Sequence, residues 1–187
     1  MRHPSPVPSE PSGTVAVLAV DFRSAWLHWP DEPHQAKETV RACEMEVKQA
    51  IENETGVLFR ADESGCLAAF HTPTEALRAA IQAQRSLISG DLPGDVKVRA
   101  KMAIHVGMTR QVAGEYQGAV VEIARRLVEL CHGGQILLSL LTRDLIDDEL
   151  PEDVELRDLG RQHIAEGKNS IKVFQALHSD IPSEFPR

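Results

Sequence analysis

The run TVAVLAVDF at residues 14–22 is the feature that most restricts how this chain can fold. From Val15 to Val20 every residue is apolar, and many are β-branched, which favours a strand. Such a run is typical of a strand buried on both faces of a sheet, and it is far too short for a membrane-spanning helix. The chain must therefore supply covering elements around a strand that ends in a carboxylate, Asp21.

Those elements follow in a regular order. Apolar residues recur at helical spacing over 34–53, and Pro73 lies in the first turn of a second helix that runs to about residue 88. VLFR at 57–60 and CLAAF at 66–70 predict a hairpin, and the alternation at 96–107 predicts a long, half-exposed strand. The order β-α-β-β-α-β predicts an α+β fold with a ferredoxin-like core, an antiparallel sheet with helices on one face.

The second half of the chain completes this domain. TRQVAG at 109–114 is expected to pair back on the long strand, and Ser139 is expected to cap a short helix that ends near residue 150. The other predicted elements are a helix at 118–131 and strands at 135–139, 154–160 and 171–177. We therefore expect one domain at 13–177, between a flexible Pro-rich tail at 1–12 and a C-terminal tail at 178–187.

The composition of the chain excludes some classes of binding partner. A net charge of −8 without a Lys/Arg cluster argues against nucleic acid, and no apolar stretch is long enough to cross a membrane. The three cysteines include no CxxC pair and sit in apolar patterns, as expected of buried free thiols in a reducing compartment. These features predict a soluble, cytoplasmic protein.

The predicted hairpin turn carries polar side chains that need an explanation. Asp62, Glu63 and Ser64 stand directly before Gly65. From the residues alone, the turn fits a solvated loop, a metal site, or a metal site that has lost a ligand. Asp21 is equally open, because an aspartate at a strand end is more often a turn or cap residue than a ligand.

The order and spacing of the motifs resemble the catalytic domain of the class III nucleotide cyclases, the adenylate and guanylate cyclase homology domain. The motifs are VLAVDF at 17–22, GCLAAF at 65–70, MAIHVG at 102–107, GEYQGAVVEIARRL at 114–127, HGGQILLS at 132–139 and LRDLG at 156–160. No one motif is specific, but their shared order covers the chain from about Gly13 to Leu177.

The resemblance implies a site with two metal ions, Mg²⁺ or Mn²⁺, held by two carboxylates. In that family the ribose 3′-oxygen attacks the α-phosphate of ATP or GTP, giving a cyclic nucleotide and pyrophosphate. The two carboxylate positions match Asp21 and Ser64, and a neutral hydroxyl is a poor ligand for a hard divalent cation. Asp62, two residues upstream, is a candidate substitute. The turn after Asp21 also lacks the family's glycine, although Arg23 could meet an anion.

A second subunit completes the site in that family, through an Asn, an Arg and a phosphate-binding Lys. The Asn position matches Glu122, the Arg matches Arg126, and the Lys matches Ala165, with Lys168 three residues away. Glu122 and Arg126 lie one helical turn apart, so an ion pair between them is the alternative interpretation.

Base selection in the family involves two further positions, which match Arg60 and Glu115. The charge pattern resembles that of adenylate cyclases, but a salt bridge between the two side chains explains it equally well.

The changes at Ser64, Glu122 and Ala165 favour a catalytically silent domain that acts as a dimeric regulatory or nucleotide-sensing module in signalling. The resemblance implies a homodimer, with ATP or GTP and a protein as further partners and no cofactor if the domain is silent. The alternative is an active adenylate cyclase or, less favourably, an active guanylate cyclase. Its Mg²⁺ or Mn²⁺ would then be held by a non-standard site, in which Asp62 or Glu122 joins Asp21 as a ligand. One half of a heterodimer ranks third.

Overall fold

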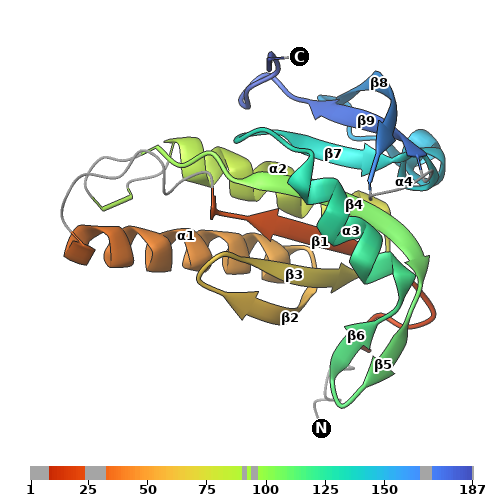
Figure 1. Cartoon of the computed structure of the whole chain (residues 1–187), viewed down its shortest axis with the longest axis horizontal. Coiled ribbons are helices and arrows are strands. Elements are labelled where there is room, and N and C mark those ends of the chain that lie inside the picture. The colour runs from red at the N-terminus through yellow and green to blue at the C-terminus, as the bar shows by residue number, and fades with distance from the viewer. Residues whose placement is uncertain (1–8, 24–32, 90–91, 94–96, 165–169, 187) are drawn as a thin grey trace, which may run out of the picture.

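The computed structural model describes residues 9–23, 33–89, 92–93, 97–164 and 170–186 (Figure 1). In chain order the elements are β1 (Thr14–Asp21), α1 (Pro33–Asn53), β2 (Val57–Asp62), β3 (Gly65–Phe70), α2 (Pro73–Ser89), β4 (Lys101–Met108), β5 (Arg110–Val112), β6 (Glu115–Gln117), α3 (Ala119–Glu129), β7 (Ile136–Ser139), α4 (Leu140–Ile146), the 3₁₀ turn Asp147–Glu149, β8 (Glu155–His163) and β9 (Ser170–Leu177).

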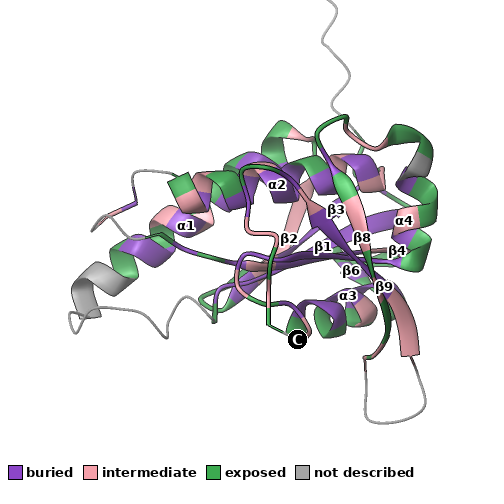
Figure 2. Cartoon of the chain, turned by 90° about the horizontal axis from the view of Figure 1, so that it is seen from above, coloured by how far each residue is buried: buried purple, intermediate pink, exposed green. Residues whose placement is uncertain are grey.

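A large sheet organises the molecule. Within the described residues its seven strands lie in the order β2-β3-β1-β4-β7-β9-β8, and β1 pairs antiparallel with both β3 and β4. The predicted βαββαβ core is confirmed, because β1, α1, β2, β3, α2 and β4 follow one another with both helices on one face (Figure 2). The pairing of β4 with β7 is parallel, so the sheet is not antiparallel throughout.

The opposite face of the sheet is covered by α3 (Figure 2). Ala16 and Leu18 of β1 pack in the core beside α1 and α2, whereas Val15, Val17 and Ala19 pack in a second core beside α3. The run that begins the domain is therefore buried on both faces, as its composition predicts.

The predicted long strand at 96–107 differs from the structure in length and exposure. The strand β4 begins only at Lys101, and its residues alternate between the two cores, with Met102 and Ile104 in one and Ala103 in the other. It is not half-exposed, because α3 covers the face that the alternating pattern assigns to solvent.

The predicted pairing of 109–114 with the long strand is wrong. The segment forms β5, which pairs with β6 as a separate two-stranded sheet. The two loop residues, Ala113 and Gly114, both have positive φ, as a type I′ hairpin turn requires. This tight loop folds the chain back so that β6, and not β4, becomes the partner of β5.

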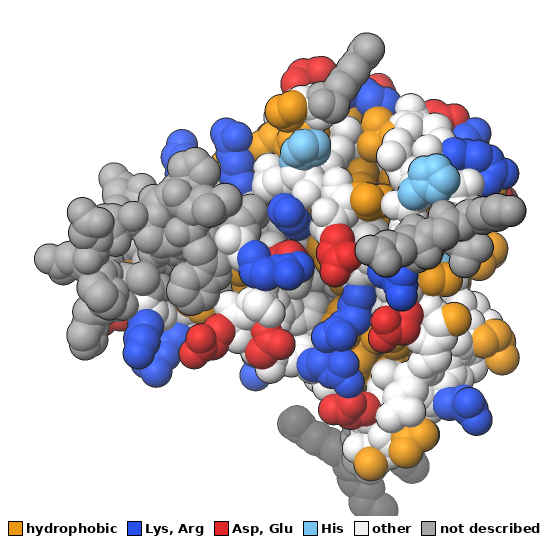
Figure 3. Space-filling model, in the orientation of Figure 1, with side chains coloured by type: hydrophobic (Ala, Val, Ile, Leu, Met, Phe, Trp, Pro, Cys, Tyr) orange, Lys and Arg blue, Asp and Glu red, His pale blue; other side chains and the backbone are white. Residues whose placement is uncertain are grey.

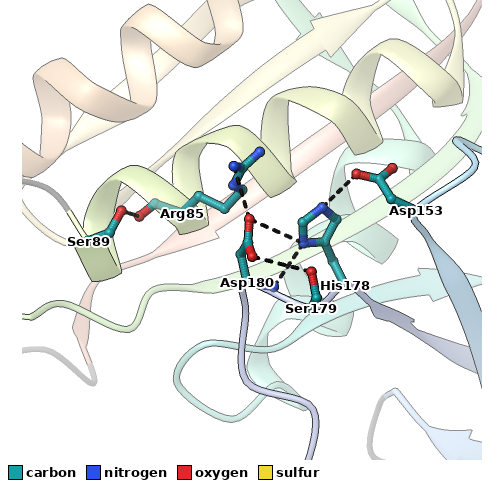
Figure 4. Close-up of polar contacts among 6 residues, drawn as sticks. All are labelled: Arg85, Ser89, Asp153, His178, Ser179 and Asp180. Carbon is teal, nitrogen blue, oxygen red and sulfur yellow. Dashed lines mark hydrogen bonds and ion pairs between the residues drawn. The ribbon is translucent and has the colours of Figure 1, made fainter.

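Parts of both predicted tails pack against the domain. Near the N-terminus, the Tyr116 hydroxyl donates to the Pro11 carbonyl, 2.8 Å away. After β9, the Asp180 backbone N–H donates to His178 Nδ1 (Figure 4). The other ring nitrogen of His178, Nε2, can therefore donate to the Asp153 carboxylate, 2.8 Å away. The Asp180 carboxylate also forms a salt bridge with Arg85 on α2. Residues 1–8 and 187 lie outside the described residues, and the exact domain boundaries remain a prediction.

Among the described helices, none combines the length and the apolar character that a membrane crossing requires.

Candidate functional site

The register of β1 and β3 brings the two predicted metal positions together. Asp21 pairs with Gly65, and the Phe22 N–H donates to the Ser64 carbonyl at 2.8 Å. This approach requires glycine at 65, because a Cβ there would lie 2.0 Å from the Val20 carbonyl oxygen. The strand end and the hairpin turn therefore form one wall of a common site.

A cavity of about 230 Å³ opens beside this wall. Its polar lining comes from the end of β1, the β2–β3 hairpin and one side of α3. The charged and hydroxyl side chains that line it are Asp21, Arg23, Arg60, Asp62, Ser64, Arg125 and Glu129. Figure 3 shows basic and acidic side chains interspersed over the middle of the molecule, with no field of a single sign.

Asp21 is the buried charge of the cavity, with an exposed fraction of only 4%. Its Oδ1 accepts the Arg23 backbone N–H at 2.7 Å, and its Oδ2 accepts Arg23 Nε at 2.9 Å and Nη2 at 2.7 Å. The hydrogen bond and charge of Asp21 raise the pKa of Arg23. The carboxylate at the end of β1 therefore already has a cation, supplied two residues along the chain.

The hairpin turn uses its own carboxylate internally. The Ser64 N–H donates to Asp62 Oδ1 at 2.8 Å, and the Ser64 hydroxyl donates to the same oxygen. These bonds from Ser64 lower the pKa of Asp62. Asp62 thus closes an Asx turn, which is an ordinary structural use of an aspartate at this place.

The residues present do not fit the pair of Mg²⁺ or Mn²⁺ ions that the resemblance implies. The second carboxylate position carries a hydroxyl, Asp21 is bound to Arg23, and Asp62 is bound to the Ser64 turn. In the part of the chain that the structure describes, no three His, Cys, Asp or Glu side chains are grouped so as to hold a metal ion.

Arg60 and Glu115 form the salt bridge that the sequence left as one of two alternatives. Arg60 Nη2 lies 2.6 Å from Glu115 Oε2, and the pair joins β2 to β6. Arg60 also lines the cavity, so the pair stands at its edge. A role of these residues in base selection remains a prediction.

Glu122 and Arg126 lie apart from this cavity, on an exposed side of α3. Arg126 donates to the Ile164 carbonyl at 3.4 Å, so its described partner is a backbone group rather than Glu122. Ala165 and Lys168 fall in 165–169, outside the described residues.

Three cavity residues have contacts that the sequence did not specify. Arg23 was expected to meet an anion, and the structure identifies that anion as Asp21 of the same chain. Arg125 and Glu129 were not predicted at all, although they lie one helical turn apart and line the cavity together. That spacing was the available signal, but nothing in the pattern tells which polar side of α3 faces the strand end.

Comparison with known proteins gives relatives without an assigned function. No family model matches the chain. An uncharacterized protein of Mycobacterium tuberculosis is 30% identical over 178 residues, which cover 94% of this chain and 60% of the relative. The chain thus spans about 60% of the length of the curated relatives it matches first.

Solved structures give a clearer result. An adenylate cyclase from Trypanosoma brucei, in its monomeric state, superposes with a TM-score of 0.81 at 16% identity, covering 95% of this chain and 94% of the other. An adenylate/guanylate cyclase/hydrolase from Silicibacter pomeroyi gives 0.73 at 24% identity, covering 87% and 95%. A dimeric guanylyl cyclase domain from Blastocladiella emersonii gives 0.75 at 11% identity, covering 91% and 99%. The chain therefore has the fold of the class III adenylate and guanylate cyclase domains, as the order of its sequence motifs predicts.

Proposed function

We propose that this chain is a catalytically silent nucleotide cyclase-like domain that acts as a dimeric regulatory or nucleotide-sensing module. The observation that carries the proposal is the hairpin turn, where Asp62 is engaged by Ser64 in closing the turn. Ser64 stands at the position that the resemblance gives to the second metal carboxylate. A hydroxyl in that position cannot supply the charge that a divalent ion beside a triphosphate needs.

Glu122 supports the same conclusion. If it takes the place of the family's ribose-positioning Asn, its carboxylate comes close to a phosphate charge in a dimer. At about 5 Å and an effective dielectric of about 20, that repulsion costs roughly 3 kcal/mol. Nucleotide binding would weaken by about a hundredfold.

The exposed positions of Glu122 and Arg126 support a dimeric arrangement. Both lie on α3, away from the cavity that contains Asp21, so one copy of the chain does not bring them to its own strand end. A second copy could do so. In a homodimer both sites would carry every change, since each chain contributes to each site.

A second candidate function is an active cyclase with a rearranged site. It is favoured by one observation, that Asp62 and Asp21 line the same cavity. For it to hold, Asp62 must leave the Ser64 turn and Arg23 must leave Asp21.

Incubation of the purified protein with ATP or GTP and Mn²⁺ tests the proposal. We expect no cyclic nucleotide. Turnover by the unmodified chain that disappears in Asp21→Ala would contradict the proposal and favour the rearranged site.

Restoration is the complementary test. A variant with Arg23→Ala, Ser64→Asp, Glu122→Asn and Ala165→Lys releases Asp21 from its ion pair and returns the family's residues, and metal-dependent nucleotide binding is expected to appear. The matched control carries Ser64→Asn in place of Ser64→Asp, which has nearly the same shape without the charge. Equal binding by both variants would show that the turn carboxylate is not what the chain lacks.

A further inference from the structure

We propose that a groove between the end of α3 and the strands β7, β9 and β8 is a docking site for an extended acidic segment of a partner protein. The chain's own residues 183–186, here called the C-terminal segment, occupy this groove as a displaceable competitor. The inference goes beyond the proposed function and does not depend on whether the cavity at Asp21 is silent.

The groove encloses a cavity of about 630 Å³ on the face of the sheet that α3 covers. Leu137 of β7 and Val173 of β9 line it from the sheet, and Leu130 lines it where α3 ends. Glu184 and Phe185 of the C-terminal segment line it as well. The segment therefore forms a wall of the groove and does not fill it, which leaves room for a longer or bulkier chain.

The donors of the groove converge on the backbone and the carboxylate of the C-terminal segment. Arg157 Nη1 and Gln175 Nε2 each donate to the Ser183 carbonyl, both at 2.9 Å. Arg157 Nη2 donates to Glu184 Oε1, also at 2.9 Å. One guanidinium thus binds a backbone carbonyl and the carboxylate of the next residue through two of its nitrogens. This arrangement favours an extended chain with an acidic residue at that place.

The Gln175 amide is oriented by a chain of buried hydrogen bonds. Gln175 is 2% exposed, and its Oε1 accepts from Gln135 Nε2 at 3.1 Å. Gln135 is 5% exposed, and its own Oε1 accepts the His132 backbone N–H at 2.9 Å. These bonds direct the Gln175 amide N–H toward the groove. A buried donor without an acceptor is unfavourable, so departure of the C-terminal segment favours another carbonyl in its place.

An aromatic ring completes the contact. Phe185 stacks on His132, with ring centroids 5.7 Å apart and an interplanar angle of 9°. Aromatic stacking adds to the attraction beyond the area that it buries. The segment that fits the groove best therefore has an acidic residue followed directly by an aromatic one.

The C-terminal segment is held more loosely than the residues just before it. Ile181 is 6% exposed and packs in the core, and the Asp180 N–H donates to His178. The Glu184 side chain, in contrast, is 82% exposed, and a salt bridge at such a site contributes little. The segment can leave while this anchor stays. A tethered competitor acts at an effective concentration on the order of millimolar, so it excludes weak ligands and yields to tight ones.

The experiment measures binding of a fluorescent peptide with the sequence of residues 180–186, DIPSEFP, by anisotropy. The full-length double variant Glu184→Ala with Phe185→Ala lacks two contacts of the C-terminal segment and retains the anchor. We expect it to bind the peptide about tenfold more tightly than the unmodified chain, because the tethered competitor is weakened. Adding Arg157→Gln to the double variant is expected to weaken binding about tenfold, as is a peptide with Gln in place of Glu.

The matched control adds Arg161→Gln to the double variant. This change removes an arginine from the same strand, but one that donates to Ser170 and does not line the groove, so peptide binding is expected to stay unchanged. If the variant with Arg157→Gln does not fold, the neutral peptide carries the comparison. Equal binding by the unmodified chain and the double variant, or equal binding of the acidic and neutral peptides, overturns the proposal.

Sedimentation of the unmodified chain and the double variant distinguishes a partner protein from a second copy. We expect the two to have the same oligomeric state. A dimer of the unmodified chain that the double variant loses would identify the occupant as the segment of a second copy, and would overturn the assignment to a partner protein. A dimer formed through α3, as in the proposed function, would persist in both, so the two proposals fail separately.

Discussion

The two halves of the predicted site differ in how far a single chain completes them. Around Asp21, the strand end, the hairpin turn and one side of α3 enclose a cavity, and its charges are paired over short distances. On the other side of α3, Glu122 and Arg126 are exposed and lie outside that cavity. The first half is fixed by backbone register and local bonds, whereas the second would need another surface to organise it.

The largest difference is expected at the backbone contact that builds the first half. Gly65→Ala places a Cβ 2.0 Å from the Val20 carbonyl, and backbone must move to accommodate it. We expect a loss of about 3 kcal/mol in the free energy of unfolding, measured by urea denaturation.

Gly13→Ala is the control for this substitution. Gly13 has a φ of 74° but open space around its missing Cβ, so only backbone strain of about 1 kcal/mol is expected. Equal losses for the two variants would mean that β1 and β3 do not approach as closely as described.

The charge pair gives the next largest difference. Arg23→Ala leaves the Asp21 carboxylate buried with only a backbone donor, and we expect a loss of about 1–3 kcal/mol in urea denaturation without divalent ions. Arg126→Ala, in the other half, is expected to change stability by less than about 0.5 kcal/mol. The comparison fails if Arg126→Ala proves the more damaging of the two.

The pH dependence of the free energy of unfolding distinguishes the cavity from the large sheet, because their titrating groups lose protons in different pH ranges. Burial lowers the pKa of His105, which bonds Ser139 Oγ on β7, from its ordinary 6.5 to about 4. Between these values the unfolded chain binds more protons, so stability falls as the pH falls, by up to about 1.4 kcal/mol per pH unit. The stability from neutral His105 is fully present above pH 6.5.

The contribution of Asp62, in the cavity, to the free energy of unfolding is expected to be lost at a lower pH than the contribution of His105. The pKa of Asp62 is held below its ordinary 3.8 by Ser64, so that contribution is present above pH 3.8 and is lost only below it. In unfolding measured from pH 7 to 4, His105→Gln is expected to flatten the dependence and Ser64→Ala to leave it unchanged. The reverse pattern would place the titrating group in the cavity.

The smallest difference concerns the turn itself. Ser64→Ala removes one hydrogen bond to Asp62 on the surface and retains the backbone bond, so a loss of about 0.5–1 kcal/mol is expected. Glu122→Ala is expected to have almost no effect on urea denaturation of the monomer. A larger effect of Glu122→Ala would indicate a contact that this chain makes through α3.

Local patterns predicted much of this structure. The apolar run at 14–22, the helical spacing at 34–53 and the polar turn before Gly65 each specify an element, and Gly65 also fixes which residue faces Asp21. The salt bridge between Arg60 and Glu115 was one of two alternatives from the sequence, beside a role in base selection, because the two side chains carry opposite charges.

The other features depend on how elements and side chains are oriented in space, which a sequence pattern does not specify. The amphipathic spacing of α3 predicts a helix but not which face of the sheet it covers, so β4 was expected to be half-exposed. The Arg23–Asp21 pair depends on how the backbone turns after Phe22, and the sequence shows only that the two residues are near. The β5–β6 hairpin depends on positive φ at Ala113, a residue that rarely adopts it.

The most direct measurement compares cyclic nucleotide formation by the unmodified chain and by a variant carrying Arg23→Ala with the three restored residues, Ser64→Asp, Glu122→Asn and Ala165→Lys. Both are incubated with ATP or GTP in Mn²⁺. The account predicts no product from the unmodified chain, and Mn²⁺-dependent nucleotide binding or turnover in the variant. Product from the unmodified chain that is lost in Asp21→Ala would contradict it.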